Sequence, residues 1–396
     1  MIYTNKDKAE HGRNAQVSLQ SILTKCVEVN YLSSYTKDYR IGKTGYNNSK
    51  QFYSPFLIEF EDGTKWIIFN TTSMRTDRIK GNQWDALNIK NIDTSITKAY
   101  IIYPDSLPST IKNEFIRQNK KIKNQDEFSA IDEILSQDCL YNLIEKQAIQ
   151  HKNKGQQKDI QGNNFETRVA NILSDEINFK KWVLSDTLQV GMHYDIFETI
   201  VNCFHLEKEN IKKIDATSDK KIIGKLPTGG FPKTDILVSV IDKRSQKHFY
   251  TISCKRSDCD SVSVHQYNAD SFAAVLDKNN SNLKQLLNKF QTVGNLRDFG
   301  EENINLLTKE LKPYKIKLLR WVLGGHGGSG NPQTQNANYI LTYNNQTNST
   351  SIYTLNDYCK KLSSTNTSGH FGTPFSWTYP SKRKSKDIQL KCKILD

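Results

Sequence analysis

The sequence predicts an α/β fold in its C-terminal half, a mixed β-sheet flanked by helices, with an additional N-terminal α+β domain. Three observations support this prediction. Two strand-like runs near the N-terminus flank a hairpin-type turn, a polar segment at 147–164 has almost no apolar residues, and strand and helix patterns resume beyond it. A chain of 396 residues has room for two or three domains. We expect one domain over 1–150 and a second over 160–396.

The N-terminal part opens with β-rich runs joined by Glu61-Asp-Gly-Thr, a sequence typical of a tight turn. Helical and strand patterns then alternate up to the polar segment, whose Gln, Lys, Asn and Gly residues predict a linker. The predicted elements are strands at 54–61, 65–72 and 98–103, a helix starting at 83–89, a helix over 125–148 and the linker over 147–164.

The C-terminal part mixes short strands with longer helices. Apolar spacing predicts helices, and short apolar runs between polar turns predict strands. The predicted elements are helices from 164, over 195–204 and over 279–312, strands at 235–241, 248–253, 316–323, 339–343 and 351–354, and a flexible glycine-rich loop over 324–332.

The composition narrows the class of protein. The chain has 55 Lys and Arg residues against 42 acidic residues, a formal charge of +13. This excess is compatible with a polyanionic partner and with a solvated basic surface. It favours the polyanionic partner only if the basic residues cluster. No run approaches the roughly 18 apolar residues of a membrane helix, and the first residues are charged where a signal peptide is apolar. The seven cysteines are scattered without CxxC spacing, so we expect a reduced, cytoplasmic protein without a zinc site.

A constellation suited to phosphodiester hydrolysis lies on the two strands predicted after residue 234. Asp235 begins the first strand and Ser253-Cys-Lys255 ends the second, so a hairpin would bring the carboxylate and the ammonium together. The carboxylate and the Cys254 carbonyl can hold Mg²⁺ through oxygen, and Lys255 can stabilise a phosphate or help to deprotonate water. Glu166, on a preceding helix, can reach the same cation. The competing interpretation is a capping aspartate and a solvated lysine.

Six motif blocks in chain order extend this constellation over residues 160–396. They are Gly162-Asn-Asn-Phe-Glu166, Gly229-Gly-Phe-Pro-Lys-Thr-Asp235, Ser253-Cys-Lys-Arg-Ser257, Val262-Ser-Val-His-Gln-Tyr267, Pro313-Tyr through Arg320-Trp321, and Phe371-Gly-Thr-Pro-Phe-Ser-Trp-Thr-Tyr379 with Ser381 and Gln389-Leu-Lys391. In these blocks the chain resembles the MspI-type type II restriction endonucleases, a PD-(D/E)xK nuclease family.

The resemblance implies a role for each matching residue. Asp235 matches the metal-binding aspartate, Lys255 the catalytic lysine and Glu166 the helical glutamate. Ser253 stands where the general pattern has an acid, so the Cys254 carbonyl or a water would replace it as a metal ligand. The positions that face DNA in the family and read G·C-rich sites are Ser263, Thr378, Ser381, Gln389 and Lys391, and Lys382, Arg383, Lys384 and Lys386 would neutralise phosphates.

The implied activity is Mg²⁺-dependent, site-specific cleavage of duplex DNA at a short palindrome such as CCGG, with 5′-phosphate and 3′-hydroxyl ends. The implied partners are double-stranded DNA and a cognate DNA methyltransferase, and a homodimer is compatible with a palindromic site. Two alternatives stay open: a sequence-specific DNA-binding protein with a decayed centre, and a structure-specific repair or RNA nuclease of the same fold. A basic protein without either activity does not account for the ordered motif blocks.

Residues 1–150 lie outside the resemblance. Their hairpin is followed by Arg75, Arg78 and Lys80, which would suit a DNA backbone, but the same pattern fits a second nuclease-like fold without its lysine, or a scaffolding or dimerisation domain. His265 and His326 are expected to be structural rather than general bases, because this nuclease chemistry needs no histidine.

Overall fold

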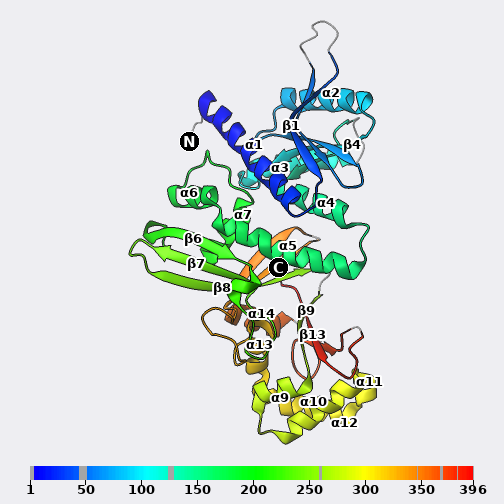
Figure 1. Ribbon diagram of the computed structural model, residues 1–396, viewed down its shortest axis with the longest axis vertical. Helices are drawn as coiled ribbons and strands as arrows, with labels where there is room; N and C mark the ends of the chain where they lie inside the picture. The colour runs from blue at the N-terminus through cyan, green and yellow to red at the C-terminus, as the bar shows by residue number, and fades with distance from the viewer. Residues whose placement is uncertain are drawn as a thin grey trace. The chain divides into compact units, whose positions relative to one another are not determined.

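A computed structural model describes residues 4–43, 51–123, 129–257, 261–345, 347–365, 369–380 and 382–395. The chain divides into two compact units (Figure 1). Unit 1 comprises Met1–Asn164 and Asp175–Glu198, and unit 2 comprises Phe165–Ser174 and Thr199–Asp396.

Unit 1 is built on a five-stranded mixed sheet. Its strands follow one another in chain order, the first three antiparallel and the last two parallel to the third. The predicted hairpin is confirmed, since the Phe60 N–H donates to the Thr64 carbonyl at 2.9 Å and Gly63 adopts a φ of 80° in the turn. The strands are β1 (Ser34–Ile41), β2 (Phe52–Glu59), β3 (Lys65–Asn70), β4 (Ile96–Tyr103) and β5 (Glu133–Ser136).

Helices cover this sheet because its central strands β2, β3 and β4 are largely buried, whereas the edge strand β1 is mostly exposed. On one face Ile67, Phe69 and Ile101 pack with Ile89 of one helix and Phe115 of the next. The helices that contact the sheet are α1 (Asn5–Glu28), α2 (Thr76–Ile92), α3 (Ser109–Lys123) and α4 (Gln137–Ile149). They are followed in the chain by α5 (Lys154–Ser174), α6 (Glu176–Leu184) and α7 (Tyr194–Cys203), and the residues of α5 and α7 are divided between unit 1 and unit 2.

Two predictions for residues 125–164 are wrong. The linker expected over 147–164 is largely the first half of α5, because Gln and Lys favour a helix as readily as a loop and outnumber the Gly and Asn residues of the segment. The helix expected over 125–148 is interrupted by β5, which forms because its backbone pairs in parallel with β4. Residues 124–128 lie outside the described part of the chain.

Unit 2 contains a second five-stranded mixed sheet, which carries the predicted site. Its order is β6–β7–β8–β10–β11, with β10 parallel to β8 and the other neighbours antiparallel. The strands are β6 (Ile211–Thr217), β7 (Ile236–Asp242), β8 (Lys247–Ser257), β10 (Tyr339–Asn344) and β11 (Ser349–Thr354). The two predicted strands around residues 235–253 therefore pair as a hairpin, with Ile236 opposite Ile252.

A smaller three-stranded sheet and a helical layer complete unit 2. The sheet has the order β12–β13–β9, from β9 (Ser261–Tyr267), β12 (Ser376–Thr378) and β13 (Ile388–Lys393). Its inner face, including Leu390 and Trp377, packs with Phe272, Phe290 and Trp321. The helices are α8 (Lys220–Ile223), α9 (Ala269–Asp277), α10 (Ser281–Val293), α11 (Leu296–Phe299), α12 (Glu301–Leu311), α13 (Lys315–Gly324) and α14 (Leu355–Thr365), with 3₁₀ turns at Lys208–Asn210 and Lys312–Tyr314.

The strand expected at 316–323 is the helix α13. Its apolar residues at 318, 319, 322 and 323 follow the i, i+4 spacing of one helix face, and all four are buried. A short apolar run fits a buried strand or a buried helix equally, so the run alone predicted the wrong element. Within the described ranges, no helix combines the length and the apolar character that crossing a bilayer requires.

Candidate active site

The β7–β8 hairpin brings Asp235 beside the Ser253-Cys-Lys255 triplet. Asp235 directly precedes β7, and its N–H donates to the Ile252 carbonyl at 2.9 Å, which places it level with the start of the triplet. Lys255 Nζ lies 3.8 Å from Asp235 Oδ2. The two groups that lie 20 positions apart in the sequence are thus close in space, as the hairpin spacing predicted.

Hydrogen bonds join these residues into one network. Asp235 Oδ2 accepts from the Cys254 N–H at 2.8 Å and from the Ser253 hydroxyl at 3.1 Å. Lys255 Nζ donates to the Ser253 hydroxyl at 2.6 Å and to the Cys254 carbonyl at 3.0 Å. Ser253 therefore positions the ammonium relative to the carboxylate, because its hydroxyl donates to Asp235 and accepts from Lys255.

Glu166 reaches the same place from α5. Its Oε2 lies 2.8 Å from Lys220 Nζ, which lies 3.6 Å from Asp235 Oδ1. Burial and the charge of Asp235 raise the pKa of Glu166 to about 7, even though Lys220 opposes that rise. Burial alone would lower the pKa of Lys220, but Asp235 and Glu166 outweigh it and raise the pKa.

These residues have the donor set of a magnesium site. Two carboxylates and the Cys254 carbonyl supply oxygen atoms, which are the ligands that Mg²⁺ prefers. Asp235 Oδ2 is engaged by the triplet, so Oδ1 is the oxygen that faces the shared space with Glu166. Burial, Asp235 and Glu166 hold the pKa of the Cys254 thiol well above its usual range, so the thiol stays neutral and is no nucleophile.

A cleft of about 470 Å³ connects the triplet with the small sheet. It is lined by Asp235, Ser253 and Lys255 on one side and by the stretch Ser263–Tyr267 of β9 on the other. Lys233, also in the wall, is half-buried and donates to the Val264 carbonyl at 2.5 Å. Burial and the charge of Lys255 lower the pKa of Lys233 to about 7.

The small sheet gathers four of the residues expected to face DNA. Lys391 lies opposite both Ser376 and Ser263, and Gln389 lies opposite Thr378. These polar side chains are exposed or half-buried, whereas the intervening residues of each strand are buried. The sheet therefore presents one polar face that includes Ser263, Thr378, Gln389 and Lys391, and we call it the recognition face.

The basic segment after β12 is only partly described, and Ser381 lies outside the described residues. Arg383 forms an ion pair with Asp387, which also accepts a hydrogen bond from Gln266 at 2.9 Å. Lys384 Nζ lies 5.7 Å from the centre of the Tyr379 ring, and Lys382 is exposed. Arg383 thus has an acidic partner within the chain, whereas the sequence predicted that it would neutralise a DNA phosphate.

Comparisons with known proteins give the family of the chain. The family model of restriction endonuclease MspI matches residues 140–392, which is more than half of the chain. The chain belongs to the MspI restriction endonuclease family. Members of this family are type II restriction enzymes, site-specific deoxyribonucleases with an α/β fold.

Two curated relatives and one solved structure resemble this MspI-family chain. The type II restriction enzyme BsuFI of Bacillus subtilis is 29% identical over 400 residues, covering 98% of both chains. The type II restriction enzyme MspI of Moraxella sp is 23% identical over 265 residues, covering 65% of this chain and 98% of that enzyme. The crystal structure of MspI with its cognate DNA matches with a TM-score of 0.53 at 21% identity, covering 61% of this chain and 92% of that one.

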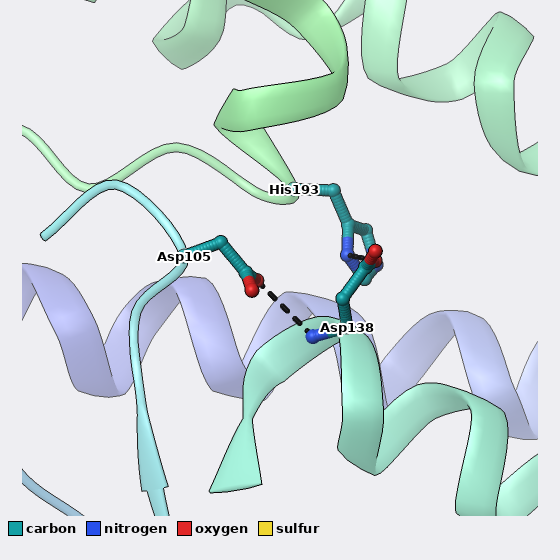
Figure 2. A group of neighbouring side chains, drawn as sticks. All are labelled: Asp105, Asp138 and His193. Atoms are coloured by element: carbon teal, nitrogen blue, oxygen red, sulfur yellow. Dashed lines mark hydrogen bonds and ion pairs between the residues drawn. The ribbon is translucent and has the colours of Figure 1, made fainter. Parts of the chain in front are cut away.

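Unit 1 of this MspI-family chain holds a further group of ionisable residues that sequence reasoning missed. Asp105, Asp138 and His193 place one ligand atom each within 4.8 Å of one another (Figure 2). His193 Nδ1 lies 2.6 Å from Asp138 Oδ1, and Asp105 Oδ2 accepts the Asp138 N–H at 3.1 Å. Burial, with Asp138 and Asp195 nearby, raises the pKa of Asp105 well above its usual range. Because these groups satisfy one another, we assign the candidate active site to unit 2.

Lys220 and Lys233 are the other residues that sequence reasoning missed in the MspI-type site. Lys220 belongs to a lysine-rich stretch, and no sequence spacing sets it apart from its neighbours as a site residue. Lys233 lies inside the block Gly229–Asp235, two positions before the aspartate. This short distance in the sequence could have indicated that Lys233 lies near the site.

Proposed function

We propose that this chain cuts both strands of DNA at a short G·C-rich palindrome such as CCGG, with Mg²⁺ as cofactor, leaving 5′-phosphate and 3′-hydroxyl ends. One observation carries the proposal: Asp235 and Lys255 converge beside Glu166 and the Cys254 carbonyl, at a cleft whose opposite wall includes Ser263 of the recognition face. Asp235, Glu166 and the Cys254 carbonyl would hold the cation. When bound, Mg²⁺ supplies charge neutralisation and a more acidic water.

The chain's own residues perform the remaining tasks. Lys255, held by Ser253 within 3.8 Å of Asp235, acts as an ammonium that stabilises negative charge on the scissile phosphate and on the attacking oxygen, whose proton is released to solvent. In-line attack at phosphorus then breaks the bond to the 3′ oxygen. Ser253 acts as a positioning residue rather than as a direct metal ligand, because its hydroxyl already bridges Lys255 and Asp235.

Sequence recognition is assigned to the recognition face and its flank. Lys391 can donate to guanine O6 and N7, and Gln389, Thr378 and Ser263 can pair with base edges. Lys382, Arg383 and Lys384 contact phosphates, and Ser381 is proposed with the base-reading group on the family resemblance. The MspI crystal structure with cognate DNA supports duplex DNA as the ligand.

The remaining partners follow from the chemistry. A site-specific nuclease endangers the DNA of its own cell, so we propose a cognate DNA methyltransferase that protects the same site. A palindrome presents the site once on each strand, so a second copy of the chain is proposed for the second cut. We place the protein in the cytoplasm, and catalysis and recognition in residues 160–396.

Incubation of supercoiled plasmid with the protein and Mg²⁺, with and without EDTA, tests the proposal. We expect discrete linear fragments with Mg²⁺ alone, and run-off sequencing then gives the site and the cut position. Retained specific binding without cutting would instead indicate a DNA-binding protein with a decayed centre. Cutting only of branched, damaged or RNA substrates would indicate a structure-specific nuclease.

A further inference from the structure

Lys220 occupies the space that the two proposed metal-binding carboxylates share. Its ammonium lies 2.8 Å from Glu166 Oε2 and 3.6 Å from Asp235 Oδ1, the oxygen that the triplet leaves unused. The side chain extends from the short helix α8, between β6 and β7, and one third of it is exposed. One lysine therefore lies between both acids of the site.

This position conflicts with a bound divalent cation. Mg²⁺ binds oxygen at about 2.0–2.1 Å and usually takes one or two carboxylates together with substrate phosphates. An ammonium between the same two carboxylates would repel that cation and compete for the same oxygen atoms. The lysine side chain is a flexible chain of four carbons and is partly exposed to solvent, so the ammonium can move away from the two carboxylates.

We propose that Lys220 is a resident counter-ion that makes metal binding depend on DNA. Without DNA, the ammonium holds Glu166 and Asp235 and keeps the affinity for Mg²⁺ low. When a phosphate enters the cleft, its negative charge offers the ammonium another partner, and both carboxylates become available to the cation. DNA binding and metal binding then favour each other, by the same factor in either direction.

The proposal rests on the proposed function, because it takes the pair Glu166 and Asp235 as metal ligands. Its consequence is distinct, however. Lys220 lowers metal affinity in the free protein, whereas an ordinary structural ion pair would leave that affinity unchanged or would support it. Charges at this position, rather than packing, decide the effect.

Calorimetric titration of Mg²⁺ alone into the DNA-free full chain tests the proposal at about pH 8.5, where Glu166 is ionised. We expect Lys220→Met to bind Mg²⁺ at least about tenfold more tightly than the unaltered protein. Lys220→Arg should keep the weak affinity, since it keeps the charge. Lys221→Met, an exposed neighbour on α8, serves as the matched control and should change nothing.

A second arm measures the coupling to DNA. A phosphorothioate duplex carrying the mapped site should raise the Mg²⁺ affinity of the unaltered protein about tenfold or more, and that of Lys220→Met by less than about threefold. If circular dichroism shows that Lys220→Met is unfolded, Lys220→Gln replaces it.

The proposal is overturned if the Lys220 variant binds Mg²⁺ with unchanged or weaker affinity. It is also overturned if the double variant with Asp235→Asn still shows the higher Mg²⁺ affinity, because the cation would then bind elsewhere. Plasmid cutting by the unaltered protein distinguishes a failure of the Lys220 proposal from a failure of the proposed nuclease function. If that protein cuts and the variant gains no affinity, only the role of Lys220 fails. If it does not cut at all, the proposed function fails.

Discussion

Ser253 illustrates how a single side chain alters the chemistry expected from a motif. The general pattern has an acid at this position, and serine there removes one carboxylate from the site. The hydroxyl instead accepts from Lys255 and donates to Asp235, so it links the ammonium to the acid that we propose as a metal ligand. The sequence predicted the convergence of Asp235 and Lys255, because strand and turn lengths determine it. It could not predict Lys220, whose contacts with Glu166 and Asp235 depend on how α5 and α8 pack.

His265 supports a prediction about stability at the same scale. The residue is buried beside Trp321, and neither ring nitrogen has a hydrogen-bond partner among the described residues. Burial, with Lys233 nearby, holds the pKa of His265 well below its usual 6.5. The folded protein therefore keeps the ring neutral, whereas the unfolded chain takes up a proton below about pH 6.5.

As the pH falls below about 6.5, the unaltered protein should lose about 1.4 kcal/mol of unfolding free energy per pH unit relative to a His265→Phe variant, until the folded pKa is reached. Urea unfolding of both proteins at about pH 7.5 and about pH 5.5 measures this difference. Parallel losses in the two proteins would show that His265 does not titrate on unfolding.

At the scale of elements, the β7–β8 hairpin was predictable and the recognition face was only partly so. The hairpin follows from two β-rich runs and a polar turn, all local in sequence. The recognition face joins β9 to β12 and β13, more than 100 residues later, and its register depends on tertiary packing. The family motifs supplied Ser263, Thr378, Gln389 and Lys391, whereas Ser376 and Gln266 were found only from the strand pairing.

Lys391 on the recognition face and Lys382 beside it are expected to contribute to DNA binding in different ways. Lys391→Ala should lower cleavage selectively at sites with the preferred base pair, because a contact to a guanine edge is lost, with a cost of about 1–3 kcal/mol. Lys382→Ala should weaken binding evenly across sequences and reduce the slope of affinity against salt by about one. Cleavage rates on duplexes with single base-pair changes measure both effects. An even loss in Lys391→Ala would make it a phosphate contact.

The first four strands of the two sheets share an order and direction, whereas the fifth strand is parallel to its neighbour in unit 1 and antiparallel to it in unit 2. In each, three antiparallel strands are followed by a fourth that is parallel to the third, and a helix precedes the first strand. In unit 1, however, β2 carries no aspartate, and the lysine of β3 is at its start rather than its end. For unit 1, the second nuclease-like fold without a catalytic set and the scaffolding or dimerisation domain both stay predictions.

At the scale of the whole molecule, the positive charge is unevenly distributed. Unit 1 has 25 Lys and Arg against 24 Asp and Glu, whereas unit 2 has 30 against 18. The excess that favours a polyanion is therefore almost entirely in the unit with the recognition face. Arg75, expected from the sequence as a possible DNA contact, is paired with Asp77 at 2.7 Å.

This distribution predicts that unit 1 contributes little to DNA affinity. Combined replacement of Arg75, Arg78 and Lys80 by alanine should leave the salt dependence of binding unchanged, whereas replacement of Lys382, Lys384 and Lys386 should reduce its slope by about two to three. Fluorescence anisotropy over a range of salt concentrations compares the two variants. A reduced slope in the unit 1 variant would assign DNA contacts to that unit.

The central claim is that Asp235 and Lys255 act together on one scissile phosphate, and paired cleavage and binding assays of Asp235→Asn and Lys255→Met test it most directly. Each variant should lose at least about a thousandfold in cleavage rate, since charge stabilisation and metal binding fail, and should still bind the mapped duplex specifically in a gel-shift assay. Cleavage within about tenfold of the unaltered protein in both variants would contradict the assignment.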